Sequence, residues 1–137
     1  MRLALLLLLC ACGTSTEVEP QLTITQGLYG QLTERCTQKD CIGAPRKGTP
    51  VGWFDRSPFV TDGGVAPVPL QETTTTDTGL FQFPIASNER GYLAIGRPEA
   101  SIGTRWFSAT SALIPLGLAR IDWHASPANE GVWTNVK

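Results

Sequence analysis

The residues that could carry hydrolytic chemistry lie close together near the end of the chain. Asp122, His124 and Ser126 follow one another at intervals of two residues, and His124 is the only histidine. Residues two apart in a strand share a face, so a Ser-His-Asp site is formally open. However, no glycine-flanked serine of the nucleophile-elbow type is present, and closeness in sequence does not make triad geometry. We therefore interpret His124 as structural and expect no enzyme activity.

The carboxylates give no better indication of a reactive site. Asp55, Asp62 and Asp77 stand where turns are expected, and aspartate in a turn bonds nearby backbone N–H groups. A calcium site built from Asp62 and Asp77 is the alternative, because loops at one end of a β-sandwich can converge. We expect no metal and no cofactor.

The first two of the four cysteines close an apolar stretch at the start of the chain. Leu3 to Leu9 form a run of seven residues, which suits a signal peptide and is far short of the about 20 residues that span a bilayer. The sequence Leu9-Cys10-Ala11-Cys12 resembles the bacterial lipobox, in which a small residue precedes a lipidated cysteine. Cys12 is a better acceptor than Cys10 because Leu9 is too large for the small-residue position.

This motif predicts a lipoprotein signal peptide over residues 1–11 and a lipidated N-terminus and flexible tether over residues 12–21. Each buried CH₂ of the lipid contributes about 0.8 kcal/mol of membrane affinity, so several chains on Cys12 would anchor the protein to the membrane. Gly13 rather than an aspartate follows the cysteine, which by resemblance favours the outer membrane of a cell envelope. A plain secretory signal with incidental cysteines is the alternative.

The other two cysteines lie in "ERCTQKDCIGAP". An exported chain meets an oxidising environment, so we predict a disulfide between Cys36 and Cys41. Half of a zinc site is the alternative, because the spacing is allowed for zinc. The chain, however, has no further cysteine once Cys10 is removed and Cys12 is lipidated, and it has a single histidine.

The charge balance excludes one class of partner. The net charge of the 137 residues is −1, and loss of Arg2 with the signal lowers the basic residues from 11 to 10 against 12 acidic ones. No basic run is longer than Arg46-Lys47, so nucleic-acid binding has no electrostatic footprint. We expect no nucleic-acid partner, and no small-molecule substrate is evident.

The body of the chain predicts strands rather than helices. Gly and Pro, 14 and 10 residues, interrupt every candidate helix, while apolar residues recur with the period of two that is typical of a half-buried strand. We predict a single all-β domain over residues 22–137, an antiparallel sandwich of about seven strands. The residues expected to share inward faces are Leu22, Ile24, Leu28 and Leu32; Val51 and Trp53; Phe81, Phe83 and Ile85; and Ala119, Ile121 and Trp123, opposite Arg120 and Asp122.

Two segments carry a resemblance to a known family. The opening Gly27-Leu28-Tyr29-Gly30-Gln31-Leu32 and the hairpin Thr75-Thr76-Asp77-Thr78-Gly79-Leu80-Phe81 resemble the carboxypeptidase regulatory-like, or transthyretin-like, β-sandwich, as found on small bacterial lipoproteins. The resemblance covers about residues 22 to 134 and implies a Greek-key sandwich. Asp77 stands two residues before Gly79 instead of the family's three, so the turn type can differ. Because one fold hosts scaffolds, adhesins and binding modules, the resemblance says little about function.

Enzymes with related folds need residues that this chain lacks. The purine-degrading hydrolases use several histidines and a Tyr-Arg-Gly-Ser-like ending, whereas this chain ends in "WTNVK". The related dioxygenases bind iron through two Tyr and two His, and only one His exists here. The resemblance therefore implies a structural or protein-interaction module attached to the envelope.

The aromatic residues give the alternative function. In the pairs Trp53-Phe54 and Trp106-Phe107, neighbours in a strand point to opposite faces, so one member of each is expected to face outward. Trp53 and Trp106 are the candidate binding surface, because an exposed aromatic on a sheet suits sugar stacking or protein contact. This hypothesis makes the domain a small carbohydrate- or peptide-binding module, with an envelope protein or a glycan as partner. Packing under a loop or over a sheet edge is the structural alternative for both tryptophans.

Overall fold

The computed structural model describes residues 21–36, 43–59, 67–101, 103–125 and 131–136. Its strands are β1 (Gly27–Glu34), β2 (Pro50–Phe54), β3 (Gln71–Thr74), β4 (Leu80–Pro84), β5 (Arg90–Glu99), β6 (Gly103–Leu113), β7 (Leu118–Ala125) and β8 (Gly131–Val136). Within these ranges there is no helix, and hence none long and apolar enough to cross a membrane. The predicted all-β class is confirmed.

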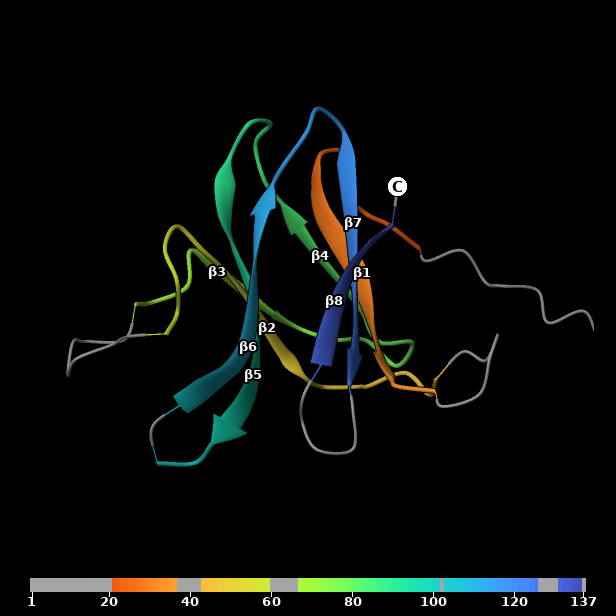
Figure 1. Ribbon diagram of the computed structural model, residues 1–137, viewed down its shortest axis with the longest axis vertical. Helices are drawn as coiled ribbons and strands as arrows, with labels where there is room; N and C mark the ends of the chain where they lie inside the picture. Colours follow the sequence, from red (N-terminus) through yellow and green to blue (C-terminus); the bar gives the residue numbers. More distant parts are fainter. Residues whose placement is uncertain (1–20, 37–42, 60–66, 102, 126–130, 137) are drawn as a thin grey trace, which may run out of the picture.

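The strands form two four-stranded sheets that lie as two layers (Figure 1). The β1 sheet has the order β4-β1-β7-β8, and the β2 sheet has the order β3-β2-β5-β6. Both sheets contribute to one hydrophobic core: Leu28 and Trp123 come from the β1 sheet, and Val51, Trp53 and Ile95 come from the β2 sheet. All five are at most 1% exposed, so the fold is a β-sandwich in which the two inner faces meet.

The alternation in the sequence predicted the inner faces correctly. Leu28 and Leu32 of β1 are fully buried, and Gly30 between them lies so close to Ile121 that a Cβ there would fall 1.8 Å from its carbonyl oxygen. Leu22 and Ile24 precede β1 and are half-buried. The other predicted inward residues lie in the core or against it: Val51, Trp53, Phe81, Phe83, Ile85, Ala119, Ile121 and Trp123.

One pair of strands departs from the purely antiparallel sandwich that we predicted. β1 and β7 run parallel, with Leu28 beside Ala119 and Leu32 beside Trp123, whereas every other strand pair between the described strands is antiparallel. Parallel neighbours need a long connection. Here the chain leaves β1, runs through the β2 sheet and β4, and re-enters at the same end as β1. Side-chain alternation reports burial, but it does not report the direction of a neighbouring strand.

A bulge in β6 prepares the site described below. Ser108 pairs with Ile95 and Trp106 pairs with Gly96, so the register shifts and Phe107 has no partner opposite it. Bulges re-aim side chains and occur beside functional sites. The side chain of Trp106 lies on the same outward face of the sheet as Gly96, whereas Phe107 packs against the core.

Candidate functional site

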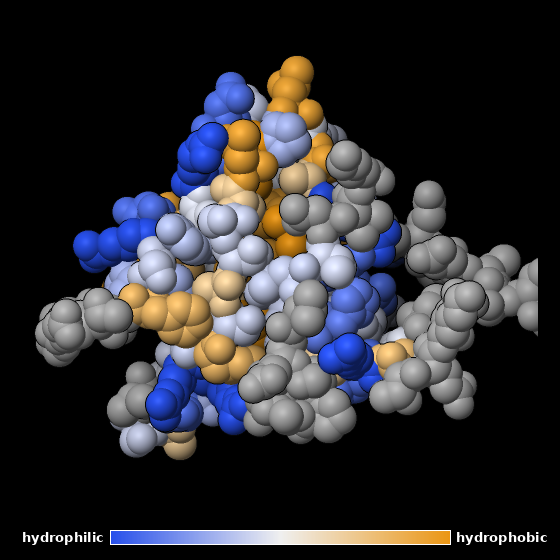
Figure 2. Space-filling model, in the orientation of Figure 1, coloured by the Kyte–Doolittle hydropathy of each residue, from blue (hydrophilic) through white to orange (hydrophobic). Residues whose placement is uncertain are grey.

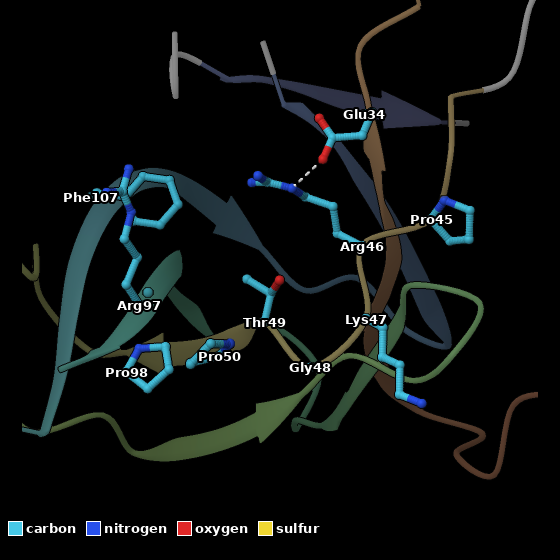
Figure 3. Close-up of a pocket in the computed structure, with 11 residues that line it drawn as sticks. Glu34, Pro45, Arg46, Lys47, Gly48, Thr49, Pro50, Arg97, Pro98 and Phe107 are labelled. Carbon is cyan, nitrogen blue, oxygen red and sulfur yellow. Dashed lines mark hydrogen bonds and ion pairs between the residues drawn. The ribbon is translucent and has the colours of Figure 1, made fainter. Parts of the chain in front are cut away.

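An open groove lies where residues of both sheets come together at one end of the sandwich. It has a volume of about 370 Å³ and receives the end of β1, the segment that leads into β2, and the bulged region of β5 and β6 (Figure 3). The lining residues are Glu34, Pro45, Arg46, Lys47, Gly48, Thr49, Pro50, Gly96, Arg97, Pro98 and Phe107.

One wall of the groove is fixed by backbone hydrogen bonds. Glu34 N donates to Ala44 O at 2.8 Å, and Arg46 N donates to Leu32 O at 2.9 Å, so the segment before β2 lies along β1. On its other side, the Thr75 hydroxyl donates to Arg46 O at 2.5 Å. Thr75 is 4% exposed. The backbone N–H and carbonyl of Arg46 both have hydrogen-bond partners, so this segment is held in place.

Arg46, in the segment before β2, makes its ion pair and its aromatic contact with residues of the β1 sheet. Its Nε donates to Oε1 of Glu34 at 2.7 Å, and its guanidinium carbon lies 5.8 Å from the centroid of the Trp123 ring. The Arg46 side chain is 29% exposed and that of Glu34 is 45% exposed. Figure 3 shows Arg46 extending across the groove toward Phe107, whereas Lys47 points away. The ion pair with Glu34 and the contact with the Trp123 ring thus fix the position of the Arg46 guanidinium.

Arg97 provides the second cation of the groove. Its guanidinium carbon lies 4.7 Å from the centroid of Phe107, within the range of a cation–π contact. Phe107 in turn meets Trp123 edge-on, with ring centroids 6.0 Å apart. Arg97 is exposed, and no described residue forms a salt bridge with it. The bulge thus places an aromatic ring under an arginine whose donors meet no carboxylate of the described residues.

The charges in the groove favour an anion. Lys47 pairs with Asp77 at 2.6 Å out in solvent, and Arg46 is shared with Glu34, which leaves Arg97 without a carboxylate among the described residues. Arginine offers a planar fork of donors that matches carboxylate and phosphate oxygens. The lining includes no histidine, cysteine or serine. Its two arginines are suited to holding an anionic group.

The prediction that Trp53 belongs to an exposed binding surface is wrong. Trp53 is 1% exposed and lies in the core. A Cβ added at Gly91 would fall 2.4 Å from Cζ2 of Trp53, so the indole occupies the space that glycine leaves in the neighbouring strand. The outward member of that pair, Phe54, is also fully buried.

Trp106 does lie on the outward face of the β2 sheet, where it is half-buried. Its ring meets Phe54 edge-on at 5.0 Å with an interplanar angle of 86°. It also covers two glycines, because a Cβ at Gly52 would fall 2.6 Å from Cη2 and one at Gly96 would fall 2.9 Å from Cε3 of Trp106. Trp106 therefore shields Phe54, and only the remainder of its surface is available to a partner.

The residues of the formal triad are not joined as a triad in the described part of the chain. The Asp122 carboxylate accepts from Gln31 N at 2.8 Å and lies 3.1 Å from Nε of Arg120. His124 contacts the Thr33 hydroxyl at 2.8 Å. Ser126 lies outside the described residues. Asp122, predicted to lie opposite the inward face, is only 7% exposed and pairs with Arg120.

Other predicted residues fall partly outside the described ranges. Cys12 and Cys41 do so, and the Cys36–Cys41 disulfide therefore stays a prediction. Asp62 does so as well, and Asp77, its proposed calcium partner, is paired with Lys47. Among the residues that the structure describes, no group of three or more His, Cys, Asp or Glu is close enough to hold a metal ion.

The groove itself was not predicted from the sequence. Arg46 and Arg97 are far apart along the chain, and Phe107 enters the groove only because of the bulge. The one local signal is that each arginine stands beside a proline, Pro45-Arg46 before β2 and Arg97-Pro98 near the end of β5. Comparison of the chain with protein-family models, with curated proteins and with solved structures finds no match.

Proposed function

We propose that this protein is a lipid-anchored component of the cell envelope whose non-catalytic β-sandwich is a protein-interaction module. The groove between Arg46 and Arg97 binds a carboxylate-bearing segment of an envelope partner. The observation that carries this proposal is Arg97, which is stacked on Phe107 and has no carboxylate partner among the described residues. A preorganised guanidinium loses little freedom on binding, which favours affinity for an acidic group.

Within the β-sandwich class, we propose a Greek-key arrangement of the transthyretin-like type. Its support is the path of the chain, which enters the β1 sheet, crosses to β2 and β3, returns with β4, crosses again to β5 and β6, and ends with β7 and β8. Two strands of each sheet are thus brought together by chain that passes through the other sheet. The fold leaves the ligand open, because function lies in the site and not in the scaffold.

The remaining parts of the proposal depend on the N-terminal motif and the cysteines. We propose removal of residues 1–11, lipidation of Cys12, attachment to the outer membrane and a disulfide between Cys36 and Cys41. Their support is the order of residues in "LLCACG" and the exported compartment that this order implies. No cofactor and no metal enter the proposed function.

A glycan-binding role is the second candidate, and the half-buried Trp106 is the observation that favours it. With Trp53 in the core, this role would depend on a single outward tryptophan. A glycan array probed with the native chain and with Trp106→Ala separates the two candidates. Loss of a signal in the variant would support glycan binding, and an array without signal would remove it.

Binding of a hexaglutamate peptide, followed by NMR in solution, tests the groove directly. We expect shifts at the Nε–H groups of Arg46 and Arg97, no shifts with a hexaglutamine peptide, and weaker binding as salt screens the charges. Arg97→Ala should weaken binding about tenfold, the equivalent of one good charge-assisted contact. Arg90→Ala is the matched control, since Arg90 is an exposed arginine at the opposite end of β5. An equal loss of peptide affinity in Arg97→Ala and Arg90→Ala would mean that only net charge matters, and it would reject the groove as the binding site.

A further inference from the structure

Three leucines are exposed on one turn of the sandwich. Leu113 ends β6 and is 50% exposed, Leu116 is 89% exposed, and Leu118 begins β7 and is 39% exposed. We call these three residues the leucine tip. Figure 2 shows hydrophobic colouring at the top of the molecule, over the β6–β7 turn of Figure 1. Clustered apolar side chains on a surface mark a site of contact.

The turn beneath the leucine tip is rigidly held. Ile114 is fully buried, its N–H donates to Glu89 O at 2.9 Å, and its carbonyl accepts from Asn88 N at 2.7 Å. The neighbouring turn fixes the tip on one side, and Gln26 fixes it on the other. Because the backbone is satisfied in this way, the leucines cannot turn inward without breaking the hydrogen bonds of the turn.

The segment that leads in from the N-terminus is bonded to this same turn. The Gln26 amide donates to Pro115 O at 3.0 Å and accepts from Gly117 N at 2.5 Å, and Gly27 N donates to Gly117 O at 2.9 Å. Gln21 is nine positions after Cys12, so Cys12 stays within roughly 30 Å of the first described residue. The chain before Gln26 runs back beside β4, where Thr23 N donates to Oε1 of Gln82 at 2.9 Å, so the tether joins the sandwich beside β4 and is linked to the leucine tip through Gln26.

The groove lies at the other end. β1 runs from Gly27 at the tip to Glu34 in the groove, and β5 runs from Arg90, which is paired with Leu113, to Arg97 in the groove. A body whose leucine tip rests on the membrane presents the groove away from the membrane. Glu89 and Arg90 beside the tip balance in charge, so an apolar surface and not an anionic one is the fitting contact.

We infer that the leucine tip is a membrane-contacting surface that rests in the lipid bilayer to which the tether is anchored. The inference rests on the proposed anchor at Cys12. Exposed leucines partition into the boundary between headgroups and acyl chains. The lipid on Cys12 keeps the leucine tip close to the membrane, so its effective concentration there is high. The tip then orients the sandwich, with the groove held outward for a partner.

The test measures the accessibility of the tip on vesicles. Residues 12–137 with Cys12→Ser retain every described residue, and an N-terminal histidine tag holds them on phosphatidylcholine vesicles that contain a nickel-chelating lipid. Leu116→Cys is compared with Ser101→Cys, an exposed position in the β5–β6 turn at the groove end. Both are labelled with a membrane-impermeant maleimide, and the chain without the added cysteine gives the background.

We expect Leu116→Cys to react at least about tenfold more slowly than Ser101→Cys on vesicles, and at a similar rate after imidazole releases the chain. Equal rates on vesicles would overturn the inference. Slow reaction of Leu116→Cys in free solution, deepening with protein concentration, would also overturn it, because a second copy would then cover the tip. The nickel tether makes the result independent of lipidation in the cell, so failure of the anchor proposal is seen separately.

Discussion

The guanidinium carbon of Arg97 lies 4.7 Å from the centroid of the Phe107 ring, across the bulge between β5 and β6. The bulge makes this contact because it removes Phe107 from the pairing and turns its ring toward the core. One irregular residue thus links the outer end of the groove to the buried Trp123, whose ring Phe107 meets edge-on. The packing of the groove is therefore continuous with that of the core through Phe107.

Phe107→Ala tests that link. We expect it to lower the free energy of unfolding by about 2–3 kcal/mol, less than the cost for a fully buried aromatic, because Phe107 is half-buried. Phe59→Ala is the matched control, since Phe59 is 48% exposed and should change stability by about 0.5 kcal/mol or less. Chemical denaturation measures both. If the two variants lose the same stability, Phe107 does not connect the groove to the core.

Trp53→Ala should act on stability and not on a binding surface. Trp53 is 1% exposed in the core, and truncating a buried aromatic costs about 3–5 kcal/mol. Trp106→Ala, at a half-buried position over Gly52 and Gly96, should cost less than half as much. Thermal and urea unfolding followed by circular dichroism measure the difference. A Trp53→Ala chain as stable as the native one would place this indole outside the core.

The inner faces of the strands could be predicted because burial alternates with residue number. Leu28 and Leu32, or Ile121 and Trp123, reveal their face by spacing alone. The same alternation does not identify which of two adjacent aromatics is outward. It also gives no sign that the outward one is covered, as Phe54 is by Trp106.

The groove escaped prediction because it is made by contacts between distant segments. Arg46 reaches Glu34 only after the chain before β2 lies along β1, and Arg97 meets Phe107 only through the register shift. A bulge leaves no period in the sequence. The parallel β1–β7 pair escaped prediction for the same reason, since the identity of a strand's neighbour is a property of the whole chain path.

Two ion pairs should differ widely in their contribution to stability, and the longer one should contribute more because it is buried. Asp122 is 7% exposed, pairs with Arg120 at 3.1 Å and accepts from Gln31 N. Asp122→Ala leaves that N–H without its acceptor and Arg120 without its carboxylate, so we expect a loss of about 2–3 kcal/mol. Asp77, paired with Lys47 in solvent, should lose about 0–1 kcal/mol on change to Ala.

Asp122→Asn separates the two contributions, because an amide oxygen can still accept from Gln31 N. Its loss should fall between those of Asp122→Ala and Asp77→Ala. Urea denaturation at neutral pH measures all three free energies of unfolding. Equal losses for Asp122→Ala and Asp77→Ala would mean that the buried carboxylate contributes no more than a surface charge.

The predicted Cys36–Cys41 disulfide would close a short loop that follows Glu34 of the groove in the sequence. Glu34 and Ala44, which flank this loop in the sequence, are joined by the hydrogen bond from Glu34 N to Ala44 O. Under non-reducing conditions, alkylation of the unfolded chain should label neither cysteine, and both should react after reduction. Because the loop is short, reduction should cost about 2–3 kcal/mol at most. Two reactive thiols in protein isolated from the envelope would reject the disulfide.

Cys12→Ala tests the anchor on which the orientation of the molecule depends. Without a thiol at position 12 no lipid can be attached, so the variant should leave the membrane fraction or accumulate as an unprocessed precursor. Cys10→Ala is the control, because Cys10 is removed with the signal and its loss should leave membrane attachment unchanged. Fractionation and mass spectrometry of the mature N-terminus measure both. A Cys12→Ala chain that is cleaved yet stays membrane-bound would mean that another part of the protein holds it there. The leucine tip is the candidate for that contact, and adding Leu116→Ser to the Cys12→Ala chain should then release the protein from the membrane.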